Sequence, residues 1–338
     1  MSMPVLKKDV PIPIQPSTPD VALDAAGIVA LADLATVQER TVLTGTAVYL
    51  DALVLCPGIH MQQSAPELNL GEYPACAALT TGYVFRIENS AMVYYLQQIG
   101  RTGQLTTLNV LPGKTSGFWS ALFSHQNATP VSALAYGLII PLTLTVLVLL
   151  GLSEDWWGIV VIMLLVISRL CNIVVIRRRS LPGWAGAPEP GVQGDLLVLL
   201  SRDRWIRIKG LVDDIKLVTS GQWLRDQTRV ESWVTALATV LVYLDAALAS
   251  NLTQFGKILL LALLIGSVGL LAIANSATKE LLMHGKVVKL VGERKKYDRR
   301  LTLAEELIAE TKRDDWAIRL GMIVKKGPLT HDDMRATM

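Results

Sequence analysis

Two charged residues stand inside stretches of sequence that are otherwise apolar, and they are the first candidates for chemistry. Arg169 lies within residues 157–176, and Asp245 lies within residues 233–249. A charge near the middle of a bilayer costs about 2.5 to 3.5 kcal/mol on insertion scales, so such residues are often retained for an ion or substrate pathway. Arg169 and Asp245 are therefore the candidate functional residues of this chain.

The depth of the two charges argues against a direct ion pair. At 1.5 Å per residue, Arg169 stands about 18 Å and Asp245 about 6 Å from the same end of their stretches, a difference of roughly 12 Å. The alternative, which the sequence favours, is that the two side chains snorkel towards opposite headgroup layers.

Three residues have the types that bind zinc, but their spacing does not fit a metal site. Cys56 and His60 form a Cys-x3-His pattern, and the next cysteine, Cys76, is distant. Structural zinc sites usually bring paired ligands from two short motifs. Ordinary buried thiols are the better interpretation, and the sequence predicts neither a metal nor a cofactor.

Two further motifs lack a required member. Residues 112–115 read Pro-Gly-Lys-Thr, the end of a phosphate-binding loop, but Leu108 stands where that loop needs its first glycine. Asp213 and Asp214 resemble a magnesium-binding acid pair without a second acidic cluster at membrane depth. No nucleophile elbow or HExxH motif is present. These absences favour a protein without catalytic activity.

The elements that must position these residues are four apolar stretches in a chain of 338 residues, 51% hydrophobic and 18% charged. About 20 apolar residues in a helix cross the roughly 30 Å hydrocarbon layer. The sequence predicts an α-helical membrane protein with four transmembrane helices in two hairpins, residues 131–176 and 233–275. The four stretches are residues 132–152, 157–176, 233–249 and 256–274.

Flanking charges predict the orientation. Arg177, Arg178 and Arg179 follow the second stretch, whereas the short connections at residues 153–156 and 250–255 contain no Lys or Arg. Positive charge near span ends tends to remain cytosolic. We therefore expect both termini and the middle loop in the cytosol, in the endoplasmic reticulum or plasma membrane, with the three arginines at the lipid surface.

The remaining chain predicts a cytosolic α+β portion built from the N-terminal region, the middle loop and the C-terminal tail. Residues 46–56 read as a buried strand, because Asp51 interrupts them and Pro-Gly ends them, and residues 91–99 also read as a strand. The predicted parts are a disordered Pro-rich arm (1–18), an α+β domain (19–130), a loop with a β-hairpin (177–232), and a basic tail with an amphipathic helix (276–338).

Two residue groups suggest contacts with lipid or with other helices. Small residues on one face of the last stretch allow close helix packing, within the bundle or in a homo-oligomer; they are Ala262, Gly266 and Gly269. A basic cluster in the tail could bind anionic lipid headgroups, at about 1 kcal/mol per charge; its members are Arg294, Lys295, Lys296, Arg299 and Arg300.

A formal net charge of +3 is too mild to predict binding to nucleic acid. The bilayer, anionic headgroups and a protein partner are the expected contacts. The leading hypothesis is a non-enzymatic membrane adaptor or regulator. The alternative is a small transporter or channel subunit that uses Arg169, Asp245 and a kink at Pro141.

Two stretches resemble a family of uncharacterised multi-pass membrane proteins of filamentous fungi. They are NLGEYPACAALTTGYVFRIENSAMVYY, residues 69–95, and GDLLVLLSRDRWIRIKGLVDDIKLVTSGQWLRD, residues 194–226. The family has no assigned activity, so the resemblance implies a fungal, membrane context and nothing about chemistry.

Overall fold

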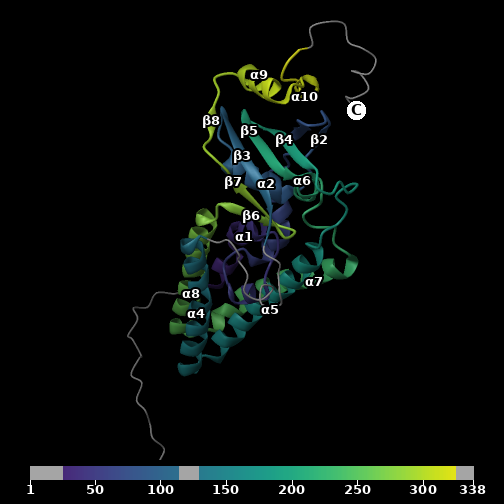
Figure 1. Cartoon of the computed structure of the whole chain (residues 1–338). Helices are drawn as coiled ribbons and strands as arrows, with labels where there is room; N and C mark the ends of the chain where they lie inside the picture. Colours follow the sequence, from purple (N-terminus) through teal and green to yellow (C-terminus); the bar gives the residue numbers. More distant parts are fainter. Residues whose placement is uncertain (1–25, 114–128, 325–338) are drawn as a thin grey trace, which may run out of the picture.

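The computed structural model describes residues 26–113 and 129–324. A β-sheet with its covering helices lies at one end of the molecule and four long helices lie at the other (Figure 1). The predicted Pro-rich arm, residues 1–18, lies outside the described residues. So do Lys114 and Thr115, the last two residues of the motif that resembles a phosphate-binding loop.

Among the described residues, four helices are long and apolar enough to cross a membrane. Short connections join α4 to α5 and α7 to α8, and Ala249–Asn251 (η4) extends α7 by a 3-10 turn. We call the end that carries these connections the turn end, and the other the sheet end. The helices are α4 (Pro130–Leu152), α5 (Trp156–Arg179), α7 (Arg229–Leu248) and α8 (Gln254–Ala277).

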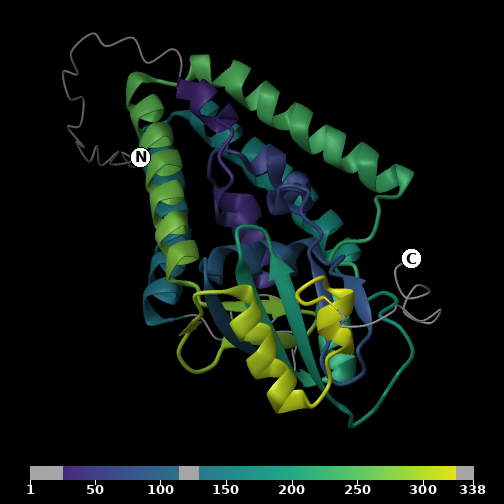
Figure 2. The ribbon, with the colours of Figure 1, turned by 90° about the horizontal axis from the view of Figure 1, so that it is seen from above.

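The helices pack in pairs that differ from the predicted hairpins. The main contacts are between α4 and α8 and between α5 and α7, so each helix packs mostly against one from the other hairpin. Ser168 of α5 donates to the carbonyl of Ala238 in α7 at 2.7 Å. The two pairs lie close together at the turn end and diverge towards the sheet (Figures 1 and 2).

An N-terminal segment occupies the space between the diverging pairs (Figure 2). It contains one α-helix and three 3-10 helices, and the predicted strand at residues 46–56 is replaced by one of the latter. The α+β domain expected at residues 19–130 therefore has its first part between the helices. The elements are η1 (Ala26–Leu31), α1 (Thr36–Thr44), η2 (Tyr49–Leu53) and η3 (Ile59–Asn69).

The segment begins at the turn end and leads towards the sheet. A Cβ on Gly27 would lie 2.5 Å from the carbonyl oxygen of Ala246, near the end of α7. Farther along, the carbonyl of Thr36 accepts from Asn275, near the sheet end of α8, at 2.8 Å. The first described residues thus lie at the opposite end from the sheet.

One mixed eight-stranded sheet gathers strands from three parts of the chain. Its order is β2-β1-β4-β5-β3-β7-β6, with β8 also paired to β3; β3 and β5 are parallel and the other pairs antiparallel. The strands are β1 (Ala75–Ala78), β2 (Val84–Arg86), β3 (Gln104–Pro112), β4 (Gln193–Leu200), β5 (Arg204–Leu211), β6 (Glu280–Met283), β7 (Lys286–Leu290) and β8 (Lys295–Lys296).

Alternation along β5 assigns its side chains to two cores. Ile206 and Ile208 join the core beneath α2 (Ser90–Ile99) and α6 (Val212–Thr219). Trp205 joins the core beneath α9 (Arg300–Thr311) and α10 (Asp315–Arg319) on the opposite face. Period-two alternation produces this division, and the β4–β5 hairpin expected in the middle loop is present.

The strand predicted at residues 91–99 is instead helix α2. Asn89 begins the helix, because its side-chain oxygen accepts from the Met92 N–H at 3.0 Å. Such a cap satisfies one of the four unpaired N–H groups of a helix start. Packing of Met92 and Tyr95 in the core then outweighs the strand preference of the Val and Tyr residues.

Candidate functional site

Arg169 lies in a buried polar cluster between the helix pairs, formed with Arg40, Asp51 and Tyr136. Its Nε donates to the carbonyl of Asp51, in η2, at 3.3 Å. The Asp51 carboxylate accepts from the hydroxyl of Tyr136, on α4, and from the Val48 N–H at 2.9 Å. The guanidinium of Arg40 lies 5.0 Å from the centroid of the Tyr136 ring. One carboxylate and two guanidinium groups thus meet between the helix pairs, towards the sheet end.

The structure contradicts the snorkelling interpretation of both intramembrane charges. Arg169 is 1% exposed and Asp245 is 0% exposed. Neither side chain reaches the molecular surface, because the N-terminal segment fills the space into which each would otherwise extend. Arg169 has a protein partner that lies 118 residues away in sequence.

Other polar side chains of the long helices also bind the backbone of the N-terminal segment. Thr143 of α4 donates to the carbonyl of Leu53 at 2.7 Å, and Asn172 of α5 donates to the carbonyl of Ile59 at 3.1 Å. Backbone that is not α-helical is tolerated at membrane depth only where protein or trapped water satisfies its polar groups. These side chains therefore allow an irregular segment to lie among apolar helices.

Asp245 is not part of the cluster. Neither of its carboxylate oxygens has a hydrogen-bond partner in the described parts of the chain. It lies on the inner face of α7, one helical turn before Ala249, where η1 packs. A buried carboxyl group without a partner is costly, which makes Asp245 the least satisfied group of the predicted pair.

The two buried thiols are poorly placed to act as nucleophiles. Cys56 lies in the core between the helix pairs and is 1% exposed. Cys76 lies in a different core, donates to the carbonyl of Phe85 at 3.3 Å, and has its pKa raised by burial. In the described ranges no group of three or more His, Cys, Asp or Glu residues could hold a metal ion. The cluster is suited to electrostatic positioning rather than to bond making.

The small residues predicted to pack helices divide between two environments. Gly266 faces α4, since a Cβ there would lie 3.3 Å from Leu142. Ala262 and Gly269 are exposed, and a Cβ on Gly269 would meet nothing within 4 Å. Packing within the bundle therefore explains only Gly266, because α8 turns the other two residues away from α4.

Of the three arginines that end α5, two bind backbone carbonyls of the protein. Arg177 donates to the carbonyl of Ala47 at 3.0 Å, and Arg179 donates to the carbonyl of Arg225 at 2.8 Å. Only Arg178 is mainly exposed, with 69% of its side chain accessible. Burial of Arg179 contradicts its lipid-surface assignment. For Arg178, which lies 3.5 Å from Glu231, the assignment stays a prediction.

The basic cluster of the tail lies away from the long helices, at the far end of the sheet (Figure 1). β8 pairs with the start of β3, whereas β7, which follows α8 and β6, pairs with its end. Lys295 pairs with Glu306 at 2.6 Å, and Arg300 pairs with Asp203. Because of this distance from the helices, the prediction that Arg294, Lys295, Lys296, Arg299 and Arg300 bind the lipid of the same membrane is not supported.

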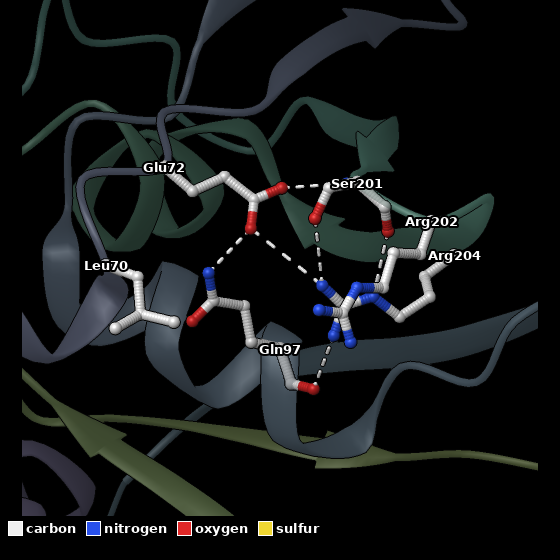
Figure 3. Close-up of a pocket in the computed structure, with 6 residues that line it drawn as sticks. All are labelled: Leu70, Glu72, Gln97, Ser201, Arg202 and Arg204. Atoms are coloured by element: carbon white, nitrogen blue, oxygen red, sulfur yellow. Dashed lines mark hydrogen bonds and ion pairs between the residues drawn. The ribbon is translucent and has the colours of Figure 1, made fainter.

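A pocket of about 360 Å³ opens at the same end of the sheet (Figure 3). It lies between the end of η3, the last turns of α2 and the β4–β5 turn. Hydrogen bonds and one ion pair join its walls. The lining residues are Leu70, Glu72, Gln97, Ser201, Arg202 and Arg204.

The acid pair proposed from sequence has structural partners. Asp214 pairs with Lys286 of β7 at 2.7 Å, and Asp213 accepts from the Glu189 N–H at 2.7 Å. Both residues thus attach α6 to neighbouring segments. An ion-binding role has no support from this geometry.

The partners of Arg169 were missed at the sequence level. The one local signal was Asp51, a single acid within an apolar stretch, and it was interpreted as the interruption of a buried strand. No protein-family model, curated protein or solved structure matches this chain. The resemblance to fungal membrane proteins therefore stays a prediction.

Proposed function

We propose that the chain is an integral membrane protein whose four long helices cross a bilayer. Support comes from the outer surfaces of the helix pairs, which are lined by exposed apolar side chains. Such a surface is costly in water but is the normal contact with lipid. Examples are Leu134 and Val148 on α4, Ile167 on α5, Leu237 and Val240 on α7, and Ile265 on α8.

The sheet supports a topology with its three contributing segments on one side of the membrane. β3 precedes α4, the β4–β5 hairpin lies between α5 and α7, and β6 follows α8. Strands that pair with one another must share a compartment, which two crossings between successive segments provide. The sheet end also carries Arg177 and Arg178, so we place it in the cytosol of the endoplasmic reticulum or plasma membrane.

Within that topology we assign the protein the role of a non-enzymatic adaptor or regulator. The observation that carries this assignment is the extent of the sheet and its helices, which stand on the membrane anchor as one connected unit (Figure 1). The cluster combines one carboxylate, two guanidinium groups and a phenol, with the buried thiol of Cys56 in the same core, and we assign no reaction to it. We assign to the surface of the sheet and its covering helices the binding of another protein or of a second copy of the chain.

A small transporter or channel subunit is the second candidate. Two observations favour it: the irregular segment between the helix pairs, and the buried carboxyl of Asp245, which has no partner among the described residues. Transport proteins place substrate sites at such interruptions. Four helices rarely enclose a pathway alone, so this role would require an oligomer.

One experiment separates the two roles. Asp245→Leu and Arg169→Leu are introduced singly, and growth-linked function is compared at equal protein abundance. The adaptor role predicts that Asp245→Leu keeps function, because no sheet contact is changed. Loss of function in Asp245→Leu at normal abundance, together with loss of ion flux in vesicles containing the protein, would establish the transport role instead.

A further inference from the structure

The end of helix α2 is held by two arginines. Arg204 donates from Nη1 to the carbonyl of Gln97 at 2.9 Å, and Arg294 donates from Nη2 to the carbonyl of Ile99 at 3.2 Å (Figure 3 shows the first). The last carbonyls of a helix have no partner within the helix and carry partial negative charge. A structural role therefore explains both of these cations.

Two further arginines at this position have no such explanation. Arg101 stands between Gly100 and Thr102, both of which lie against Arg204. Arg202 lines the pocket and has a left-handed backbone, with a φ of 61°. Both are exposed, and in the described ranges neither has a carboxylate within ion-pair distance. We call Arg101, Arg202, Arg204 and Arg294 the arginine corner.

The walls of the pocket already bind one oxyanion, the carboxylate of Glu72 (Figure 3). It accepts from the Ser201 N–H at 2.7 Å and from Nε2 of Gln97 at 2.6 Å, and Arg204 lies 3.8 Å away. Partial burial opposes ionisation, yet these donors and the Arg204 charge hold the pKa of Glu72 below its usual value. Arg202 lines the same pocket without a carboxylate partner in the described ranges. Arg294 binds a backbone carbonyl at the end of α2, so positive charge is in surplus around this end of the sheet.

We propose that the arginine corner binds an acidic segment of a partner protein, with carboxylate or phosphate groups of that segment pairing with Arg101 and Arg202. The proposal rests on the adaptor function and names the kind of partner it would recruit. Guanidinium groups match both oxyanions through paired N–H donors. Exposed arginines that are not already paired offer such contacts without first breaking an internal ion pair.

The position of the corner favours a protein over the lipid of the same membrane. The pocket is lined by the β4–β5 turn, at the end of the sheet remote from the four helices (Figure 1). Headgroup attraction falls off within a Debye length of about 8 Å at physiological salt. A segment that approaches from the aqueous side has direct access to both free arginines.

The test uses the full chain in nanodiscs of neutral phosphatidylcholine and three fluorescent peptides. One contains alternating Glu and Gly, one contains phosphoserine, and one is the neutral Gln counterpart. We expect the Glu or phosphoserine peptide to bind and the Gln peptide not to bind. Arg101→Gln combined with Arg202→Gln should weaken binding about tenfold, as expected for two exposed charge contacts.

The control removes the same charge elsewhere. Arg178→Gln combined with Arg229→Gln changes two exposed arginines at the sheet end of the long helices and should leave peptide affinity unchanged. An equal loss of affinity in this control would overturn the proposal, because it would show non-specific attraction. Absence of peptide binding, or binding of vesicles of anionic lipid in place of peptides, would overturn it as well.

Crosslinking in cells distinguishes failure of the corner from failure of the adaptor function. A photoreactive residue is placed at Arg202 or at Tyr83, which immediately precedes β2 and is 65% exposed. Protein adducts from Arg202 that are competed by the acidic peptide support the proposal. Adducts from Tyr83 alone reject the corner and keep the adaptor. No adducts from either position count against both.

Discussion

Arg169 connects helix α5 to the N-terminal segment, a role that its neighbours in sequence do not reveal. Its guanidinium joins α5 to the carbonyl of Asp51, and the Asp51 carboxylate in turn bonds Tyr136 on α4. Removing one member of a buried charged group typically costs 3 to 5 kcal/mol, about what a marginally stable fold can lose. The cluster should therefore contribute strongly to the docking of the N-terminal segment.

We predict that Arg169→Leu lowers the apparent unfolding temperature of the protein in detergent by several degrees. The charge that attracts Asp51 is then lost, and the carbonyl of Asp51 loses its donor. Arg178→Leu is the matched control, because that side chain is 69% exposed and its partner Glu231 keeps a closer ion pair with Arg225. Equal unfolding temperatures for the two variants would show that the cluster does not hold the segment.

Replacement of Asp245 is expected to change the unfolding temperature in the opposite direction. Its carboxyl oxygens have no partner among the described residues, so Asp245→Leu removes a desolvation cost without breaking a hydrogen bond. We predict an unchanged or higher unfolding temperature. Asp51→Leu should lower it, because Asp51 accepts from Val48 and Tyr136. A drop for Asp245→Leu as large as that for Asp51→Leu would contradict the structure.

The sequence identified Arg169 and Asp245 because a charge within an apolar stretch is a local signal. It could not identify the partner of Arg169, since the contact joins residues 118 positions apart. Snorkelling was the favoured interpretation because the sequence gives no indication that a separate segment lies between the helix pairs. The burial of both charges results from the fold of the whole chain, so the apolar stretches alone do not predict it.

At the scale of elements, Asp155 connects the two short turns. Its Oδ1 accepts from the Gly158 N–H at 3.0 Å and so caps α5. Its Oδ2 accepts from the N–H of Thr253 at 3.0 Å and from the Thr253 hydroxyl at 2.6 Å, at the start of α8. A Cβ on Gly256 would lie 2.1 Å from the same Oδ2, so glycine is required there.

We predict that Asp155→Ala destabilises the protein by about 1 to 3 kcal/mol, since a helix cap and a buried acceptor are both lost. Gly256→Ala should also destabilise it, through the clash with Oδ2. The double variant should lose less than the sum, because removal of the carboxylate makes room for the new methyl group. The free energy of unfolding in detergent checks this prediction, with Glu154→Ala, at an exposed position, as the control. Strictly additive losses in the double variant would contradict the contact between Asp155 and residue 256.

Helix α9 is attached to the sheet by an ion-pair network centred on Arg207. The guanidinium contacts Asp195 at 2.5 Å and Glu310 at 2.7 Å. The hydrogen bond from Arg207 holds the pKa of Glu310 below its usual value. The contribution is limited, because half of the Glu310 side chain is exposed.

A lowered pKa in the folded state means that the Glu310 contact is present above its unfolded pKa, about 4.5, and is lost as pH falls through the folded value. We predict that acidification from pH 5 to pH 3 lowers the amide protection factors of α9, which correct for the slower intrinsic exchange at low pH, and changes those of α2 less. Glu310→Gln should show the looser α9 already at pH 5 and a smaller further change. A pH response in α9 that the variant leaves intact would point to other carboxylates.

Local patterns explain which elements were predictable. The alternation of Trp205, Ile206, Arg207 and Ile208 is visible in the sequence and agrees with a strand that has two buried faces, part of the hairpin predicted in the middle loop. Residues 91–99 were predicted to form a strand, and valine and tyrosine do favour sheets, but Asn89 caps a helix there. Core packing decides between the two, and it depends on residues far away in sequence.

For the whole molecule, the sheet depends on the helices that interrupt it. The parallel pairing of Leu105 with Trp205 and of Asn109 with Lys209 joins strands between which α4 and α5 both lie. The charged residues that flank the apolar stretches predicted that these segments share one side of a membrane. They did not predict that the segments form one sheet. Hydropathy could not place residues 26–69 between the helix pairs, because no single stretch there has the length of a span.

The path of the N-terminal segment predicts an additional passage through the bilayer. Gly27 packs against Ala246 at the turn end, whereas Thr36 contacts Asn275 at the sheet end. If the helices cross a membrane, the residues near Ile28 face the compartment opposite to the sheet. Ile28 is 63% exposed and so is suitable for labelling.

We predict that Ile28→Cys in sealed vesicles reacts with an impermeant maleimide from the same side as Glu154→Cys, in the turn between α4 and α5. Arg202→Cys, at the far end of the sheet, should react only from the other side. The native Cys56 and Cys76 are buried, and the half-buried Cys171 of α5 is replaced by Ser to remove background labelling. Reaction of Ile28→Cys from the side of Arg202→Cys would place the beginning of the segment with the sheet, and the passage between the helix pairs would then be refuted.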